Sequence, residues 1–171
     1  MSATDHYIPS IPENSVIKDK LTYLLDMARS AYDSDAYEDE FIAFEFHHGA
    51  SEDKLAAVEA HFGITLDDEH KDLLRFSDGA ILCSNHAELY DMNTLISVND
   101  MGYEDSFPKG FIIIGETVGD GEALCYSHSE HRFITLFEGE ITEFDSFSEW
   151  LGDILESIKE RLEECIGYEE Q

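Results

Sequence analysis

The sequence predicts an α+β protein in which an antiparallel, mixed-order sheet of about five to six strands has helices packed mainly on one side. Three observations lead to this prediction. Apolar residues recur at helical spacing near both ends of the chain and in a pair of capped segments between positions 51 and 78. Short β-type segments separated by turn residues fill positions 80 to 144. Because these segments are joined by short turns, antiparallel pairing is expected.

The first expected helix follows Ser10. Ser10 and Glu13 have the spacing of a capping box, and Pro12 is tolerated in a first helical turn. One face of the helix is then marked by apolar residues at helical intervals: Ile17, Leu21, Leu24, Leu25, Ala28 and Tyr32.

The acidic region after this helix contains an apolar patch, Phe41 to Phe46, which fits either a short strand or a hydrophobic plug. We therefore divide the chain into a frayed N-terminus (1–9), an N-terminal helix with an acidic extension (10–44), and an α+β core with a C-terminal helix (45–171). At 171 residues these parts are expected to form one compact domain that buries roughly 70% of its unfolded surface.

Two short helices with clear start and stop signals come next. Ser51 is placed to cap the first, and Gly63 supplies the left-handed residue that ends it. Asp67 is placed to cap the second, which Asp78 and Gly79 close. These residues are not chemically reactive, so their expected role is structural.

The expected strands and the closing helix follow from short patterns. The hairpin between the last two strands is predicted at Glu138 and Gly139. The strands are expected at 80–82, 87–90, 111–114, 122–126, 132–137 and 140–144. A second capping box, Ser146 with Glu149, opens a helix whose apolar face is Phe147, Trp150, Leu151, Ile154, Leu155, Ile158 and Leu162.

This order of motifs resembles the SUKH superfamily over roughly residues 45 to 155. The similar features are a small-Ser-Glu start at Ala50, a Glu in mid-helix (Glu59), a Phe-Gly-Ile stop at Phe62, and a terminal Asp-Gly at Asp78. A Phe-Pro precedes an apolar strand, a Gly-Asp-Gly turn follows it, and Phe147 and Trp150 open the last helix. One departure is Leu66-Asp67, where the family usually has Leu-Pro. Asp caps a helix as Pro begins one, so the fold is expected to survive this change.

The resemblance implies a function in protein binding. The superfamily contains bacterial immunity proteins of polymorphic toxin systems and fungal cell-wall regulators. What the resemblance implies for this chain is an immunity protein, or antitoxin, that neutralises a cognate toxin by stoichiometric binding.

Charge is the second major property of the chain. Thirty-nine Asp and Glu face ten Lys and Arg, which gives a formal net charge of -29. Such an excess argues against binding to nucleic acid or an anionic membrane, and it attracts a basic partner over long range. A role in solubility, or adaptation to a salty habitat, is the alternative reading of the same charge.

The cysteines and the N-terminus indicate a cytoplasmic protein. Cys83, Cys125 and Cys165 are odd in number, widely separated and without a CxxC pair, as expected of reduced thiols. The N-terminal segment lacks the basic start and apolar run of a signal peptide, and no apolar run is long enough to span a bilayer.

Motifs for catalysis, cofactors and metals are weak. Gly119-Asp120-Gly121 is better read as a β-turn than as a dinucleotide fingerprint, because Leu124 stands where the third glycine belongs. His128 and His131 lie in an expected turn, and Cys125 lies on an expected buried strand. We therefore expect no enzyme activity, no cofactor and no dedicated metal site.

The expected functional surface combines acids with aromatic residues at strand ends and turns. The residues predicted to bind the partner are Tyr103, Glu104, Asp105, Glu116, Asp120, Glu122 and Tyr126. The predicted partner is a basic toxin of the nuclease type, encoded nearby, because such toxins bind phosphates with Lys and Arg. The alternative is a non-enzymatic regulatory interaction module, or an acidic DNA mimic that inhibits a nucleic-acid-binding protein.

Overall fold

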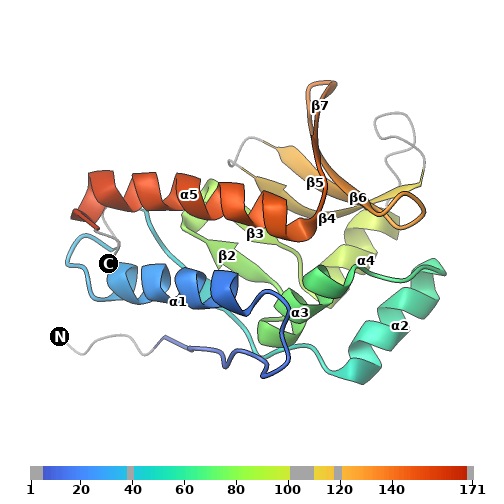
Figure 1. Cartoon of the computed structure of the whole chain (residues 1–171), viewed down its shortest axis with the longest axis horizontal. Coiled ribbons are helices and arrows are strands. Elements are labelled where there is room, and N and C mark those ends of the chain that lie inside the picture. The colour runs from blue at the N-terminus through green and yellow to red at the C-terminus, as the bar shows by residue number, and fades with distance from the viewer. Residues whose placement is uncertain (1–5, 38–40, 101–109, 118–120, 169–171) are drawn as a thin grey trace.

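The computed structural model describes residues 6–37, 41–100, 110–117 and 121–168. Five α-helices and seven strands are found in these residues (Figure 1). The helices are α1 (Lys18–Tyr32), α2 (Glu52–Phe62), α3 (Asp68–Phe76), α4 (Met92–Asp100) and α5 (Phe147–Ile166), with a short 3-10 helix η1 (Ser84–His86). The strands are β1 (Glu45–Phe46), β2 (Ala80–Leu82), β3 (Ala87–Leu89), β4 (Phe111–Thr117), β5 (Glu122–Ser127), β6 (Arg132–Phe137) and β7 (Glu140–Phe144).

The strands form one antiparallel sheet in the order in which they occur along the chain, β1 to β7. The α+β class and the antiparallel pairing are thereby confirmed, whereas the expected mixed strand order is wrong, because every strand pairs with the next one along the chain. The sheet has one strand more than the upper limit of the prediction, because the apolar patch at 41–46 contributes β1. Glu138 and Gly139 connect β6 to β7 with φ of 49° and 84°, as a two-residue type I′ hairpin requires.

Helix α1 begins at Lys18, so the capping box expected at Ser10 and Glu13 is wrong. The reason is that the N–H groups just before the helix bind acceptors other than Ser10 and Glu13. The Val16 N–H donates to the Oδ2 atom of Asp72 in α3 at 2.7 Å, and the Ile17 N–H donates to Ser15 Oγ at 3.2 Å. A tertiary contact from Asp72 and a local contact from Ser15, rather than the predicted capping box, therefore accompany the start of the helix.

The expectation of a frayed segment at 1–9 is corrected for residues 6 to 9. The His6 ring stacks on Tyr32 with centroids 3.9 Å apart, Tyr7 contacts His48, and Pro9 is buried. This part of the N-terminal segment thus packs along α1.

The caps predicted for α2 and α3 are confirmed. Ser51 accepts from the Lys54 N–H at 3.2 Å, Gly63 ends α2 with φ of 67°, and Asp67 accepts from the first N–H groups of α3. Glu59 accepts from the Leu66 N–H at 2.7 Å and so ties α2 to the linker before α3.

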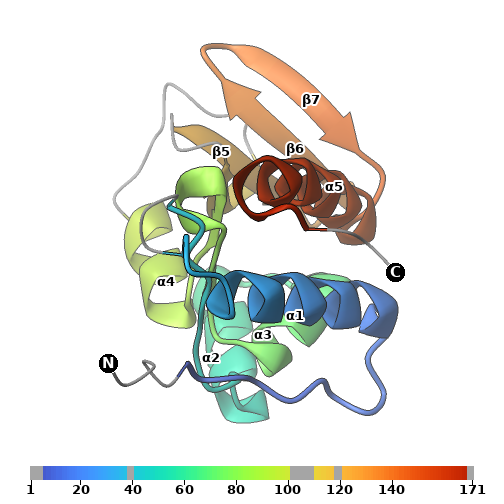
Figure 2. The same ribbon diagram turned by 90° about the vertical axis from the view of Figure 1, so that its left-hand side faces the viewer.

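Helix α5 packs on one face of the sheet. Ser146 accepts from the Glu149 N–H at 3.1 Å, and all seven apolar residues of the predicted face are buried. The Phe147 ring contacts Phe133 of β6 at a centroid distance of 5.7 Å. In Figure 2, α5 lies between the β6–β7 hairpin and α1, whereas α4 lies to the side. Among the helices described, none is long and apolar enough to cross a membrane.

Candidate functional site

The register of the sheet aligns one side chain from every strand. Residues that pair directly in neighbouring strands point to the same face. Following these pairs from β1 to β7 gives a row, here called the cross-sheet row: Glu45, Ile81, Glu88, Glu116, Ala123, Leu136 and Ile141.

The cross-sheet row lies on the face opposite the one that α5 covers. The pairs next to it, such as Ala80 with Leu89, are buried in the core. The carboxylates of Glu45, Glu88 and Glu116 are exposed, and Ile141 is 51% exposed. One half of the row is therefore acidic, and the other half is apolar, with Ile141 exposed, Leu136 half-buried and Ala123 buried.

A β-bulge places Glu116 in this row. Ile113 pairs with Cys125 and Gly115 pairs with Leu124, so Ile114 is an extra residue in β4. The Asn99 side chain of α4 bonds both the Ile113 N–H and the Ile113 carbonyl at 2.8 Å. If the side chains alternated regularly from Ile113 onward, Glu116 would point to the opposite face, which α5 covers.

Gly115 permits the close approach of β3 and β4 beside the bulge. A Cβ atom on Gly115 would lie 2.5 Å from the Glu88 carbonyl oxygen, closer than any ordinary contact. Because glycine has no side chain, the strands that carry Glu88 and Glu116 can approach each other closely at this point.

The acids of the row repel one another. Glu88 and Glu116 are direct cross-strand partners, and like charges in that position are destabilising. Partial burial raises the pKa of Glu88, and the carboxylates of Glu116, Asp91 and Glu45 raise it further. In the part of the chain that the structure describes, no Lys, Arg or His pairs with Glu45, Glu88 or Glu116. The row thus carries negative charge that the described residues do not neutralise.

The structure separates the two acids predicted to act together on either side of the Gly-Asp-Gly turn. Glu116 pairs with Ala123, whereas Glu122 pairs with Thr117, whose side chain is buried on the core face. The Thr117 hydroxyl donates to the Glu122 carboxylate. Glu116 therefore faces the solvent on the cross-sheet row, and Glu122 belongs to the other face.

Tyr126 is not at the surface, which corrects the expectation that it anchors a partner. Its ring is 1% exposed and stacks on Phe133 at 4.8 Å, and its hydroxyl lies 3.5 Å from the Thr65 carbonyl oxygen. Burial raises its pKa to about 12. Tyr103, Glu104, Asp105 and Asp120, also predicted for the partner-binding face, lie outside the described residues.

Glu45, Glu88, Leu136 and Ile141 are members of the row that sequence reasoning missed. A signal for the two acids is present, because each stands between buried residues in an alternating pattern: Phe44 and Phe46 around Glu45, and Ala87 and Leu89 around Glu88. The alternation indicates an exposed position, but only the register shows that these positions are neighbours.

The chemistry available elsewhere is limited. Burial raises the pKa of Cys125 to about 12 and that of Cys83 to about 11, so both thiols are protonated at neutral pH. Two hollows of about 430 and 410 Å³ lie along α1, and their linings do not bring a nucleophile and a base together. The described residues contain no group of three or more His, Cys, Asp or Glu arranged to hold a metal ion. The cross-sheet row is therefore the best candidate site, and it is suited to binding.

Comparison with known families identifies the family of the chain. The model of the SMI1 / KNR4 family (SUKH-1) matches residues 49–153, which is more than half of the chain and runs from the start of α2 into α5. No curated protein sequence matches the chain significantly.

Proposed function

Because the chain belongs to the SMI1 / KNR4 family (SUKH-1), we propose that it is an immunity protein of the cytoplasm. In this proposal it neutralises a cognate toxin by stoichiometric binding, and the toxin is basic and of the nuclease type. The residues that contact the toxin are the exposed members of the cross-sheet row, together with Glu104, Asp105 and Asp120.

The observation that carries this proposal is the unneutralised charge of the row. Glu88 and Glu116 face each other across two strands at the expense of stability. A basic side chain from a partner, placed between them, would convert this repulsion into attraction on both sides. In the adjoining apolar half, the exposed Ile141 and the half-buried Leu136 supply surface whose burial strengthens a complex.

The mechanism of neutralisation is occlusion. A nuclease binds the phosphates of its substrate with Lys and Arg, and an acidic protein seated on those residues denies them to the substrate. The net charge of -29 steers the two proteins together over long range. Rapid capture matters because an immunity protein has to bind the toxin before the toxin acts. No catalytic step or cofactor is needed.

An acidic DNA mimic is the alternative, and the composition of the row argues against it. A mimic presents acids in a regular series, as phosphates are presented along a duplex. Here Ala123, Leu136 and Ile141 continue the line that Glu88 and Glu116 begin. Half of the row is thus suited to a protein surface rather than to a site that recognises phosphate geometry. A regulatory interaction module would use the same face, and the identity of the partner separates it from an immunity protein.

Co-purification with the product of the neighbouring gene tests the proposal. We expect a complex of one to one stoichiometry that survives size-exclusion chromatography and suppresses the toxicity of that product in cells. A matched pair of variants defines the site: Glu88→Gln with Glu116→Gln on the row, and Asp26→Asn with Glu164→Gln on exposed positions of α1 and α5. If neither the adjacent product nor any other toxin is bound or suppressed, the immunity function is refuted.

A further inference from the structure

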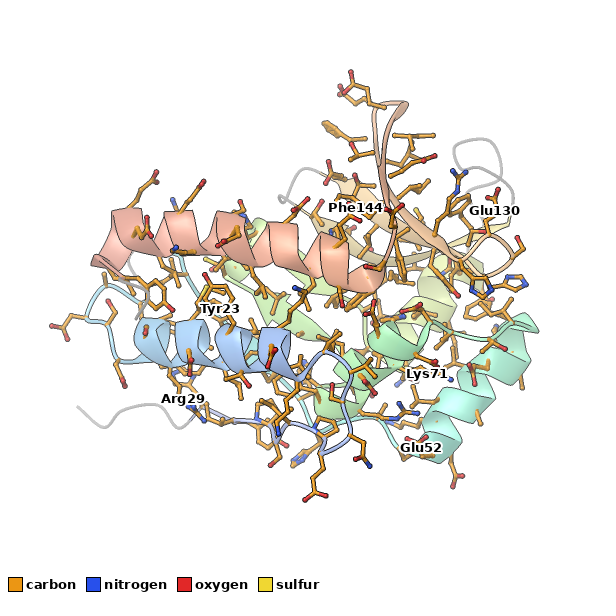
Figure 3. The ribbon with its side chains drawn as sticks, in the orientation of Figure 1. Tyr23, Arg29, Glu52, Lys71, Glu130 and Phe144 are labelled. Carbon is orange, nitrogen blue, oxygen red and sulfur yellow. The ribbon has the colours of Figure 1, made fainter. Side chains whose placement is uncertain are left out.

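The two edges of the sheet differ in how their backbone groups are used. The edge strand β7 pairs only with β6, and its residues from Glu140 to Glu143 are exposed. The β6–β7 hairpin projects beyond α5 (Figure 1), and side chains stand out from it above Phe144, which lies at its foot (Figure 3). This edge is five residues long and open to a partner.

Hairpin geometry identifies the free backbone groups of β7. In a two-residue hairpin the closing pair, Phe137 with Glu140, is hydrogen bonded, and hydrogen-bonded pairs then alternate with non-hydrogen-bonded pairs. Thr142 and Phe144 therefore direct their N–H and C=O groups toward β6. Ile141 and Glu143 direct theirs away from the sheet, where a further strand would lie.

The opposite edge is closed by the chain itself. Strand β1 is two residues long, and the residue before it, Phe44, has both backbone groups satisfied by tyrosines. The Phe44 N–H donates to the Tyr37 hydroxyl at 3.0 Å, and the Tyr32 hydroxyl donates to the Phe44 carbonyl at 2.9 Å. Natural proteins cover or shorten exposed edges in this manner. The open edge at β7 is thus a local feature and not a property of the whole sheet.

Charge determines which strand fits the open edge. Glu138, Glu140 and Glu143 are exposed on the hairpin, and Arg132 is its single cation, paired with Glu130 and Glu143. A second copy of the chain would bring the same acids against these, with a net charge of -29 on each molecule. Self-pairing is therefore opposed by electrostatics, whereas a basic strand is attracted.

We propose that β7 accepts an extended, basic segment of the partner protein as an eighth strand of the sheet. The backbone groups of Ile141 and Glu143 hydrogen bond to that segment, as in other cases of strand addition. Its side chains alternate, with apolar residues on the face of Ile141 and a Lys or Arg beside Glu140 on the other face. The proposal rests on the proposed function for the partner's basic character, and it adds where and how the partner is held.

Amide hydrogen exchange tests this inference without the natural partner. The probe is a synthetic octapeptide of alternating Lys and Val, and the control is the same peptide with Glu in place of Lys. In the protein alone, Ile141 and Glu143 amides should exchange fast and the Thr142 amide slowly. With saturating Lys-Val peptide, exchange at Ile141 and Glu143 should slow by about tenfold or more. The Glu-Val peptide should have no effect.

Ile141→Pro provides the matched variant. Proline removes an N–H that points away from β6, so the hairpin should persist, and it blocks the added strand. Ile141→Ala, which keeps the N–H, should retain protection by the peptide. Protection that is absent in the wild type, or that survives in Ile141→Pro, would overturn the inference. A third result would also overturn the inference: the Ile141 and Glu143 amides become protected as the protein concentration rises without peptide, and sedimentation shows a dimer. That result would assign the edge to a second copy of the chain.

The two proposals fail separately. If the partner co-purifies equally well with wild type and Ile141→Pro, strand addition is refuted and the immunity function stands. If Lys-Val peptide is bound at β7 but no toxin is found, the edge is confirmed as a strand-accepting site and the immunity function is refuted.

Discussion

Glu88 of β3 and Glu116 of β4 lie directly opposite each other, and both are exposed. Gly115, beside them, allows the strands to approach so closely that a Cβ atom there would overlap the Glu88 carbonyl. The fold thus holds two like charges opposite each other, where they destabilise the free protein.

The first prediction is that Glu116→Gln stabilises the free protein. Removing one of two opposed carboxylates should raise the free energy of unfolding by a few tenths to about 1 kcal/mol, because cross-strand repulsion is lost. Urea denaturation at low ionic strength measures the change, and added salt should reduce it. Glu164→Gln, an exposed acid on α5, is the control and should have a smaller effect. A destabilised Glu116→Gln would show that the pair is not repulsive.

The second prediction concerns His70, a fully buried residue on α3. Neither of its ring nitrogens has a hydrogen-bond partner among the described residues, and burial lowers its pKa to about 4. Between pH 6.5 and 4 the unfolded chain binds a proton at this position that the folded protein does not. Above pH 6.5 this difference in proton binding does not affect the free energy of unfolding. As the pH falls from 6.5 toward 4, proton binding by the unfolded chain lowers the free energy of unfolding.

At pH 5 this loss should be about 2 kcal/mol relative to pH 7.5. His70→Leu has no such proton, so the difference in unfolding free energy between variant and wild type should grow in favour of the variant as the pH is lowered. Parallel urea titrations at several pH values measure it, and the many surface acids affect both proteins alike. A difference that does not change with pH would refute the buried, neutral state of His70.

The third prediction concerns the attachment of α5 to the sheet. Trp150 is 1% exposed and packs beside Phe147, whose ring contacts Phe133 of β6. Trp150→Ala should reduce the free energy of unfolding by about 3–5 kcal/mol, through lost burial and the cavity that is left. Glu160→Ala, on the exposed side of the same helix, should change it little. An unchanged melting temperature for Trp150→Ala would contradict the observed docking of α5.

The parts of the fold that the sequence predicted well depend on local signals. Ser51, Gly63, Asp67 and Ser146 cap or end their helices through contacts within a few residues, so their spacing is sufficient to find them. The apolar face of α5 was found for the same reason, because helical periodicity is a local property.

The parts that it missed depend on contacts between distant residues. The start of α1 is accompanied by a contact from Asp72, which lies 56 residues from Val16 in the sequence. The face on which Glu116 lies is fixed by the bulge that Asn99 satisfies. Tyr126 belongs to a run, Ala123–Ser127, that is buried on both faces, so alternation carries no information about its side chain.

The last prediction separates the cross-sheet row from the acids of the opposite face. Glu88→Gln with Glu116→Gln should slow association with the co-purified partner about threefold at low ionic strength, and the salt dependence of the rate should become weaker. Asp26→Asn with Glu164→Gln removes the same charge from α1 and α5, and it should change the association rate less. Glu122→Gln should slow association less than Glu116→Gln alone, because Glu122 accepts a hydrogen bond from Thr117 and lies on the face that α5 covers. Since all these variants keep the size of the side chain, differences between them report position rather than packing.

Stopped-flow association at two salt concentrations provides the measurement. Equal rates for the row pair and the control pair would mean that net charge alone steers the partner, and the row would lose its assignment as the contact surface.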